Sequence, residues 1–157
     1  MKLADIIPKK AIVPQLKARD KKGALKEIVQ VLKGLPGGER ISVNEAVDLL
    51  MAREKNCSTC IGGCVAVPHA KLESLKGVVG ALGRAPHGID YGAIDGEPVQ
   101  LIFLILIPAQ KSEQYLTALR KISQAIRLPN IVKFLKAAKG IREIEEIFRE
   151  IEEGVTI

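Results

Sequence analysis

The sequence predicts a single α/β domain in which a mostly buried β-sheet is flanked by helices on both faces. Two predicted strands, Val78–Leu82 and Val99–Ile107, are almost uninterrupted apolar runs, which is typical of strands covered on both sides. Segments with helical spacing of apolar residues precede, separate and follow them, so the layers combine helices with a sheet. The content of 47% hydrophobic and 27% charged residues fits one globular domain spanning residues 1–157.

Two helices are predicted before the first strand. The first covers residues 23–34, and its apolar face consists of Leu25, Ile28, Val29 and Leu32. The second is expected to begin after Ser42, because Ser42 and Glu45 form an S-x-x-E capping box. It is expected to end near Lys55, which places Arg53 in its last turn.

A segment of small residues follows the second helix and is predicted to be a loop that leads into a short strand, Cys64–Val67. Pro68 has no N–H for a sheet ladder and is expected to end this strand. His69 is therefore expected just beyond its carboxyl end, where α/β sheets bind their ligands. The other histidine, His87, lies in a Pro-His-Gly segment that is predicted to be a surface turn.

The last third of the sequence predicts three helical segments after the strand Val99–Ile107. Ser112 is expected to cap a long helix with a core face of Leu116, Leu119, Ile122 and Ile126. Pro129 separates this helix from the segment 131–140. The final helix is expected to bury Ile141, Ile144, Ile147, Phe148 and Ile151.

The composition narrows the classes of partner. The formal charge of +6 favours acidic partners, but aromatic residues make up only 3% and the basic residues are dispersed, so no nucleic-acid partner is expected. The amino-terminal segment is interrupted by Asp5 and Pro8 and does not resemble a signal peptide. The longest apolar run falls well short of the roughly 20 residues that span a bilayer. We expect a cytoplasmic protein without membrane insertion.

His69 is the candidate for chemistry. A neutral imidazole is nucleophilic near neutral pH, and phosphoryl transfer requires mainly positioning and charge stabilisation around it. Arg53 is suited to clamp phosphate oxygens, and Thr59 to donate its hydroxyl. The loop that contains Ser58 and Gly62 is of a kind that presents backbone N–H groups to anions. Spacing alone leaves open a purely structural, hydrogen-bonded His69.

The stretch R-E-K-N-C-S-T-C-I-G-G-C-V-A-V-P-H-A (residues 53–70) resembles the phosphohistidine signature of type-2 enzyme IIA domains of the phosphoenolpyruvate-dependent phosphotransferase system. This family includes fructose, mannitol and nitrogen-regulatory members. Residues 11–25 and 90–109 extend the resemblance, which covers most of the chain. It implies a mixed β-sheet flanked by helices.

The resemblance also implies roles for individual residues. His69 is implied as the phosphorylated residue, through the ring nitrogen farther from the backbone, and Arg53 as the phosphate-site arginine. Ser58, Thr59 and Gly62 are implied to shape the loop. No cofactor is implied. The implied donor is a phosphohistidine carrier protein, and two functions remain open: a nitrogen-regulatory role with target proteins, or a sugar-specific role that passes phosphate to a IIB protein.

Tyr115 is the first departure from the family pattern. It stands where the family usually has a second active-site histidine, after P-A at the start of a long helix. A phenol can donate one hydrogen bond to a phosphoryl oxygen, but it remains neutral near pH 7. We therefore expect Tyr115 to belong to the site and to affect the rate of phosphorylation rather than its occurrence.

Three cysteines form the second departure. Cys57, Cys60 and Cys64 occupy positions where the family usually has glycine, and together with His69 they suggest a metal- or redox-sensing module as a third function. A structural zinc site usually adds a distant second ligand pair, which the sequence lacks. The favoured interpretation is small buried thiols, with no metal and no stable disulfide.

Overall fold

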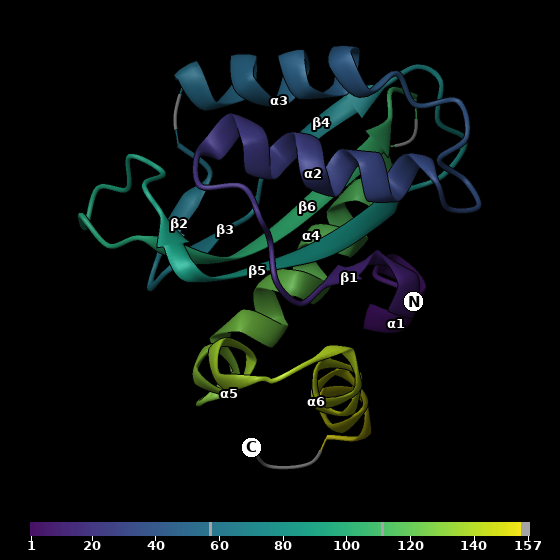
Figure 1. The fold of residues 1–157 in the computed structure, drawn as a ribbon. Coiled ribbons are helices and arrows are strands. Elements are labelled where there is room, and N and C mark those ends of the chain that lie inside the picture. Colours follow the sequence, from purple (N-terminus) through teal and green to yellow (C-terminus); the bar gives the residue numbers. More distant parts are fainter. Residues whose placement is uncertain (57, 111, 155–157) are drawn as a thin grey trace.

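The computed structural model describes residues 1–56, 58–110 and 112–154, which form a mixed β-sheet with helices on both faces (Figure 1). The predicted fold class is confirmed. The helices of this part of the chain are α1 (Leu3–Ile6), α2 (Lys21–Lys33), α3 (Val43–Asn56), α4 (Ser112–Arg127), α5 (Ile131–Ala137) and α6 (Ile141–Glu153), with a 3₁₀ helix at Lys9–Ala11. The strands are β1 (Ile12–Val13), β2 (Cys60–Gly62), β3 (Val65–Ala66), β4 (His69–Leu72), β5 (Val79–Ile89) and β6 (Val99–Pro108).

The strand β6 lies at the centre of the sheet. The strand order is β1-β5-β6-β3-β2, and β4 also pairs with β6. The β5–β6 pair is antiparallel, whereas β1–β5, β3–β6 and β4–β6 are parallel. Every residue of β6 except Gln100 is buried, as the apolar run predicted. Fully burying each Leu, Ile or Phe side chain of such a strand contributes roughly 1.5–3 kcal/mol.

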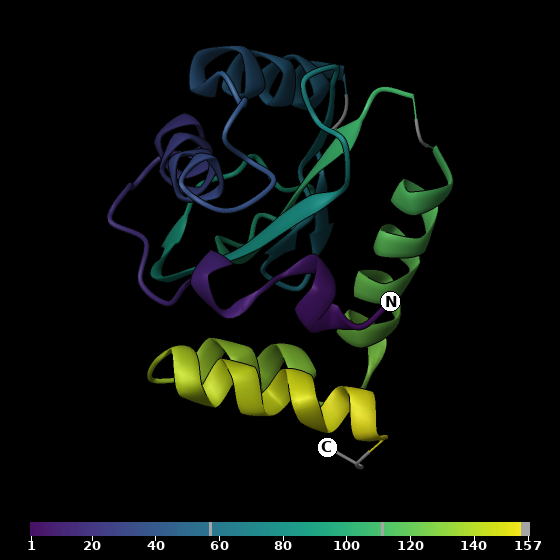
Figure 2. The same ribbon diagram turned by 90° about the vertical axis from the view of Figure 1, so that its right-hand side faces the viewer.

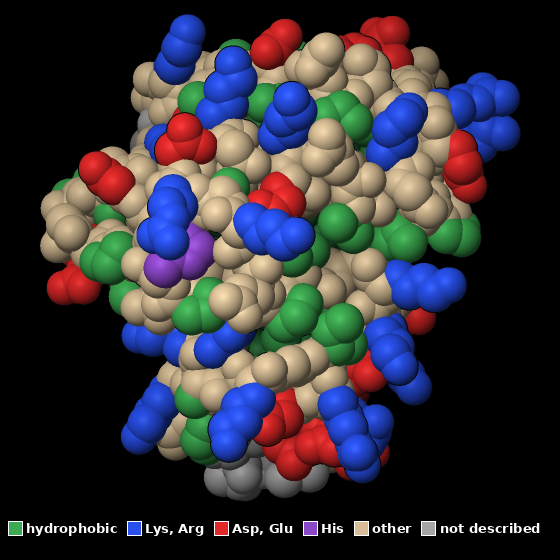
Figure 3. Space-filling model, in the orientation of Figure 1, with side chains coloured by type: hydrophobic (Ala, Val, Ile, Leu, Met, Phe, Trp, Pro, Cys, Tyr) green, Lys and Arg blue, Asp and Glu red, His purple; other side chains and the backbone are tan. Residues whose placement is uncertain are grey.

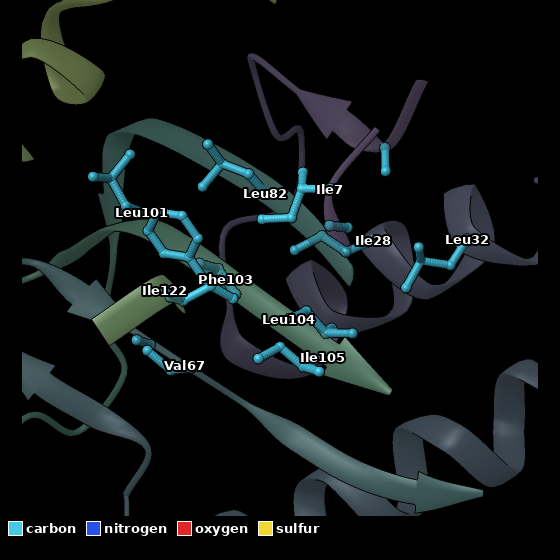
Figure 4. Packing of buried hydrophobic residues seen from close by; sticks show 14 of the residues in the cluster. Ile7, Ile28, Leu32, Val67, Leu82, Leu101, Phe103, Leu104, Ile105 and Ile122 are labelled. Atoms are coloured by element: carbon cyan, nitrogen blue, oxygen red, sulfur yellow. The ribbon is translucent and has the colours of Figure 1, made fainter. Parts of the chain in front are cut away.

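The two faces of the sheet are covered by different helices. Gly83 of β5 pairs with Ile102, and a Cβ at Gly83 would lie 2.7 Å from Cδ1 of Ile28, so α2 packs directly on this face. The neighbouring pair, Leu82 and Phe103, points to the opposite face, where α4 contacts β6 and Ile122 is buried (Figure 4). Figure 2 shows α4 beside the sheet and α5 and α6 beneath it.

The first two long helices match their predictions closely. The predicted apolar face of α2 is buried, but α2 begins before Gly23, because the Asp20 side chain caps it by accepting the Gly23 N–H at 2.7 Å. At the start of α3 the Glu45 N–H donates to the Ser42 hydroxyl at 3.4 Å, which confirms the part of the predicted capping box that Ser42 supplies. Arg53 lies in the last turn of α3, as predicted.

Two strand predictions were wrong. The segment predicted to be a loop contains β2, which pairs antiparallel with β3 because Gly62 and Gly63 adopt positive φ angles and turn the chain back. The predicted turn around His87 lies inside β5. A register shift between Arg84 and Ile89, with Gly88 at φ +74°, lets the strand continue past this segment. His87 is exposed, as predicted, and its Nε2 lies 2.9 Å from the Ala18 carbonyl oxygen.

The core face of α4 was predicted partly wrongly. Ala118 and Ile122 are buried with Ala125, whereas Leu116 is 55% exposed. Leu116 precedes Ala118 by two residues, which is about 200° around a helix, so it points away from the sheet. The predicted cap by the Ser112 side chain lies outside what the structure describes. In α6, Ile144 and Phe148 are buried and the other predicted residues are partly buried against the core.

The surface is mixed in charge. Lys and Arg side chains are distributed from α3 to α6 on the face shown in Figure 3, with acidic side chains between them. This dispersed arrangement agrees with the pattern in the sequence. Among the described helices, none combines the length and the apolar character needed to cross a lipid bilayer.

Candidate functional site

His69 lies at a break between two strands that pair with the same neighbour. Ala66 of β3 pairs with Ile102, and His69 of β4 pairs with Ile105, both in parallel. Pro68 interrupts the ladder because it has no N–H, but its carbonyl oxygen accepts the Ile105 N–H at 3.0 Å. His69 follows the end of β3, as predicted, but the chain then resumes its pairing with β6, so that His69 is also the first residue of β4.

The imidazole of His69 points to the face of the sheet that carries α4. Paired residues of neighbouring strands share a face, so His69 lies on the same side as Ile105. Tyr115 in α4 approaches from this side, with its ring centroid 5.7 Å from that of His69 and the ring planes inclined by 36°. Both side chains are half-buried. The fold thus brings together the two residues that the sequence placed 46 positions apart.

The hydrogen bond of His69 identifies its tautomer. Nδ1 lies 3.0 Å from the carbonyl oxygen of Val67. Because a carbonyl oxygen only accepts, Nδ1 carries the hydrogen and donates it. Nε2 of the neutral ring therefore retains its lone pair. This nitrogen is the one farther from the backbone, and it is the nucleophilic atom of the ring.

Arg53 and Tyr115 act on one another electrostatically. Burial raises the pKa of the Tyr115 phenol above its usual value, and the charge of Arg53 opposes this increase. The guanidinium therefore lies close enough to Tyr115 for its charge to act on the phenol. The first turns of α4 thus place a neutral hydrogen-bond donor beside His69, and the last turn of α3 places a cation whose charge acts on that donor.

Thr59 has a different role from the predicted one. Its hydroxyl donates to Glu54 Oε1, and its backbone N–H donates to the same carboxylate at 3.2–3.3 Å. Thr59 is only 6% exposed. A hydroxyl has one hydrogen to donate, so the predicted donation by Thr59 to a phosphoryl group is corrected: this hydrogen is engaged with Glu54. Ser58 accepts the Cys60 N–H at 3.1 Å and tightens the same loop.

Gly62 is the last residue of β2, where the chain enters the hairpin turn toward β3. Its φ of +89° is a conformation that favours glycine. The next N–H, that of Gly63, donates to Asp95 Oδ2 at 3.2 Å, which connects this turn to the loop before β6. Gly62 pairs with Val65, four residues before His69, or about 13 Å along a strand. Its place in the structure is thus the hairpin turn, at a distance from the imidazole.

The cysteines do not gather around His69 in the described part of the chain. Cys57 lies outside the described residues. Burial raises the pKa of the Cys60 thiol, which disfavours the thiolate that metals bind. Cys64 is buried at φ +71°, and its Sγ lies 3.8 Å from Lys136 Nζ. Among the described residues, no group of three His, Cys, Asp or Glu side chains is arranged to hold a metal ion.

A buried polar junction that was not predicted from the sequence consists of Glu54, Thr59, Tyr91 and Lys21. The Glu54 carboxylate accepts a hydrogen bond from the Tyr91 hydroxyl at 3.0 Å and lies 3.4 Å from Lys21 Nζ. Desolvation raises the pKa of Tyr91, which keeps its phenol a donor. One signal was available: Glu54 continues the helical stripe of Ala46 and Leu50 at four-residue spacing, and both of these are buried.

The mixed sheet flanked by helices is the fold of a class of protein, the EIIA domains of phosphotransferase systems. Residues 5–151 match the family model described as phosphoenolpyruvate-dependent sugar phosphotransferase system, EIIA 2, and the chain belongs to this family. The resemblance seen in the sequence is thereby confirmed.

Individual relatives narrow the comparison. The chain is 35% identical to a nitrogen regulatory protein of Bradyrhizobium diazoefficiens, over 94% of each chain. It is 31% identical to a fructose-specific EIIABC component of Bacillus subtilis, over 96% of this chain and 23% of that protein. The crystal structure of nitrogen regulatory protein IIA-Ntr from Neisseria meningitidis superposes with a TM-score of 0.83 at 29% identity, covering 93% of this chain and 98% of the other.

Proposed function

We propose that this protein is a cytoplasmic phosphoryl carrier that accepts phosphate on Nε2 of His69 from a phosphohistidine carrier protein and acts mainly as a regulator of the nitrogen-regulatory type. The observation that carries the proposal is the 3.0 Å contact from His69 Nδ1 to the Val67 carbonyl oxygen. It holds the ring in the tautomer with Nε2 unprotonated, beside Tyr115, on whose phenol the charge of Arg53 acts.

The proposed transfer is a balanced exchange between two imidazoles. The Nε2 lone pair of His69 forms a bond to phosphorus, and the P–N bond of the donor phosphohistidine breaks, returning its electron pair to the donor ring. The positive charge that the His69 ring gains is shared with Nδ1–H, which points at the Val67 carbonyl oxygen. Arg53 stabilises the negative phosphoryl oxygens, and Tyr115 donates one hydrogen bond to them.

A regulatory role is supported by the nitrogen regulatory relative, which matches over almost its whole length. Phosphorylation adds about −1.5 to −2 charges at neutral pH. At a half-buried site on the surface, this change is large enough to alter the binding of regulatory target proteins. We propose that such binding depends on whether His69 carries phosphate.

The direct test is incubation with labelled phosphoenolpyruvate and the two general carrier proteins of the system. We expect acid-labile label on His69 and none on His69→Ala. The matched control is His87→Ala, which changes the other histidine and should label normally, since His87 is exposed in β5. Absence of label on the wild type, or label that survives His69→Ala, would overturn the proposal.

A sugar-specific role is the second candidate, because the fructose-specific relative contains a region 31% identical to this chain. In that case phosphate on His69 would pass to a IIB protein and then to a sugar. A chase with purified fructose-type and mannitol-type IIB proteins separates the two. Rapid transfer to one of them favours the sugar-specific role, whereas retention of label on His69 favours regulation.

A further inference from the structure

Glu54 is a buried carboxylate that accepts hydrogen bonds from several donors. Its side chain is 2% exposed and accepts from the backbone N–H and hydroxyl of Thr59, from the Tyr91 hydroxyl and from Lys21 Nζ. Burying a carboxylate is costly unless its oxygens are satisfied in this way. The four donors come from the start of α2, from the residue before β2 and from the loop after β5, so Glu54 joins three segments that are distant in the sequence.

A continuous path of hydrogen bonds leads from this carboxylate to the imidazole of His69. Glu54 accepts the Thr59 N–H, and the Thr59 carbonyl oxygen accepts the Val67 N–H at 3.0 Å. The Val67 carbonyl oxygen then accepts Nδ1–H of His69 at 3.0 Å. Each residue along the path donates at one end and accepts at the other, so a displacement of Thr59 shifts the carbonyl oxygen that fixes the His69 tautomer.

Lys21 and Tyr91 stabilise the carboxylate end of this path. Lys21, the first residue of α2, places its ammonium 3.4 Å from Glu54 and 4.4 Å from the centre of the Tyr91 ring. The end of α3 and the start of α2 are thereby held together, as the two adjacent helices in Figure 1 show. Arg53 is the residue before Glu54, so the same contacts also fix the helical turn that carries the phosphate-site arginine.

We infer that Glu54 is a positioning residue for phosphoryl acceptance: through Thr59 and Val67 it holds His69 in the tautomer with Nε2 unprotonated. The inference rests on the proposed function for its catalytic consequence, but the tautomer can be measured in the unphosphorylated protein. Glu54 touches neither the phosphoryl group nor the imidazole. Its effect on rate is indirect.

The test compares Glu54→Gln with Glu45→Gln, the same substitution at an exposed position of the same helix. In Glu54→Gln the new amide would turn an NH₂ group toward groups that are themselves donors. Because the variant loses a charged acceptor of hydrogen bonds, we expect an about tenfold or greater fall in the maximal rate of His69 labelling. The KM for the phosphorylated carrier should change little, and Glu45→Gln should label at the wild-type rate.

The tautomer of the His69 ring distinguishes a positioning role of Glu54 from a purely structural one. A residue that only stabilises the fold would leave this tautomer unchanged. The ¹⁵N chemical shifts of Nδ1 and Nε2 distinguish a protonated from an unprotonated nitrogen, and they should show one tautomer in the wild type and a mixture in Glu54→Gln. All rates and spectra are taken well below the unfolding temperature of each variant. Wild-type rate and ring shifts in a folded but less stable Glu54→Gln would overturn the inference.

Thr59→Val keeps the test decisive if Glu54→Gln does not fold. It removes the hydroxyl donor and retains the backbone N–H, so the ring should shift toward the same tautomer mixture and the rate should fall less than for Glu54→Gln. Where both variants fold, the double variant should label about as slowly as Glu54→Gln alone, because both act through one path. Fully additive losses, or unchanged ring shifts in Thr59→Val, count against the inference. If the wild type shows one tautomer but is not labelled, the proposed function is rejected. The effect of Glu54 on the His69 tautomer can still be measured in that case.

Discussion

Two parts of this protein each combine a tyrosine with a basic side chain, but they differ in what this pair stabilises. In the buried junction, the phenol of Tyr91 and the ammonium of Lys21 surround the carboxylate of Glu54. At the candidate site, the phenol of Tyr115 lies beside His69, and the charge of Arg53 acts on that phenol. Each pairs one tyrosine with one cation, and the two tyrosines are the only ones in the sequence.

The difference between them is the origin of the negative charge. In the junction it belongs to the protein and is buried, so the tyrosine and lysine hold the fold together. Tyr91 is accordingly 1% exposed, whereas Tyr115 is half-buried. At His69 we propose that the negative charge arrives as a phosphoryl group. The comparison suggests that removing the Tyr91 hydroxyl or the Lys21 ammonium reduces mainly stability, whereas removing the corresponding groups of Tyr115 and Arg53 reduces mainly the labelling rate.

The largest effect is expected from Arg53→Gln. Removing one group that stabilises developing negative charge typically costs about 10²–10³-fold in rate, and glutamine cannot replace the charge or the bidentate geometry. The initial rate of His69 labelling should therefore fall by about 100-fold or more. Thermal unfolding, measured in parallel, should change little. A rate within a few-fold of the wild type would remove Arg53 from the site.

A smaller effect on rate is expected from Tyr115→Phe. The substitution removes one hydrogen bond to a charged oxygen and leaves the ring packed against His69, so we expect a loss of about tenfold. Stopped labelling time courses measure this rate. If Tyr115→Phe instead lowered stability and left the rate intact, the assignment of the two tyrosines would be reversed.

Tyr91→Phe is the matched variant in the junction. It leaves Glu54 Oε1 with the Thr59 donors only, and we expect the free energy of unfolding to fall by about 1 kcal/mol. Urea unfolding measures the change. The labelling rate should fall less than in Tyr115→Phe, and the opposite order would contradict the comparison.

Tyr115→His tests the electrostatic part of the comparison. The raised pKa of Tyr115 keeps its phenol protonated up to and beyond its ordinary value near 10, so its hydrogen bond should not vary between pH 6 and 8. An imidazole there has an ordinary pKa of about 6.5, and lowering the pH through that value adds positive charge. The ratio of the Tyr115→His rate to the wild-type rate should therefore rise as the pH falls from 8 to 6. A constant ratio would show that charge at this position has no effect.

The smallest effect is expected from Cys64→Gly. A side chain at φ +71° costs about 1 kcal/mol, which glycine avoids at some cost in chain entropy and in the contact with Lys136. We expect a gain in unfolding free energy below about 1 kcal/mol and unchanged labelling with and without added zinc. A zinc-dependent change in the wild type that disappears in this variant would support the metal-sensing alternative.

The elements that depend on local pattern could be predicted from the amino-acid sequence. The apolar run of β6, the buried face of α2 and the position of Arg53 in the last turn of α3 follow from periodicity and capping, which are properties of neighbouring residues. The motif around His69 likewise identified the family, because it is contiguous in the chain.

The directions of individual polar groups, in contrast, depend on how distant segments pack together. The Thr59 hydroxyl was expected to face a phosphate, but it donates to Glu54, in a junction completed by Tyr91 and Lys21 from more than 30 positions away. Leu116 likewise fits a helical stripe and is exposed, because α4 docks through Ala118 and Ile122. The periodicity of apolar residues predicts which residues share one face of a helix or strand. The direction of a side-chain hydrogen bond depends instead on which distant segment supplies the partner.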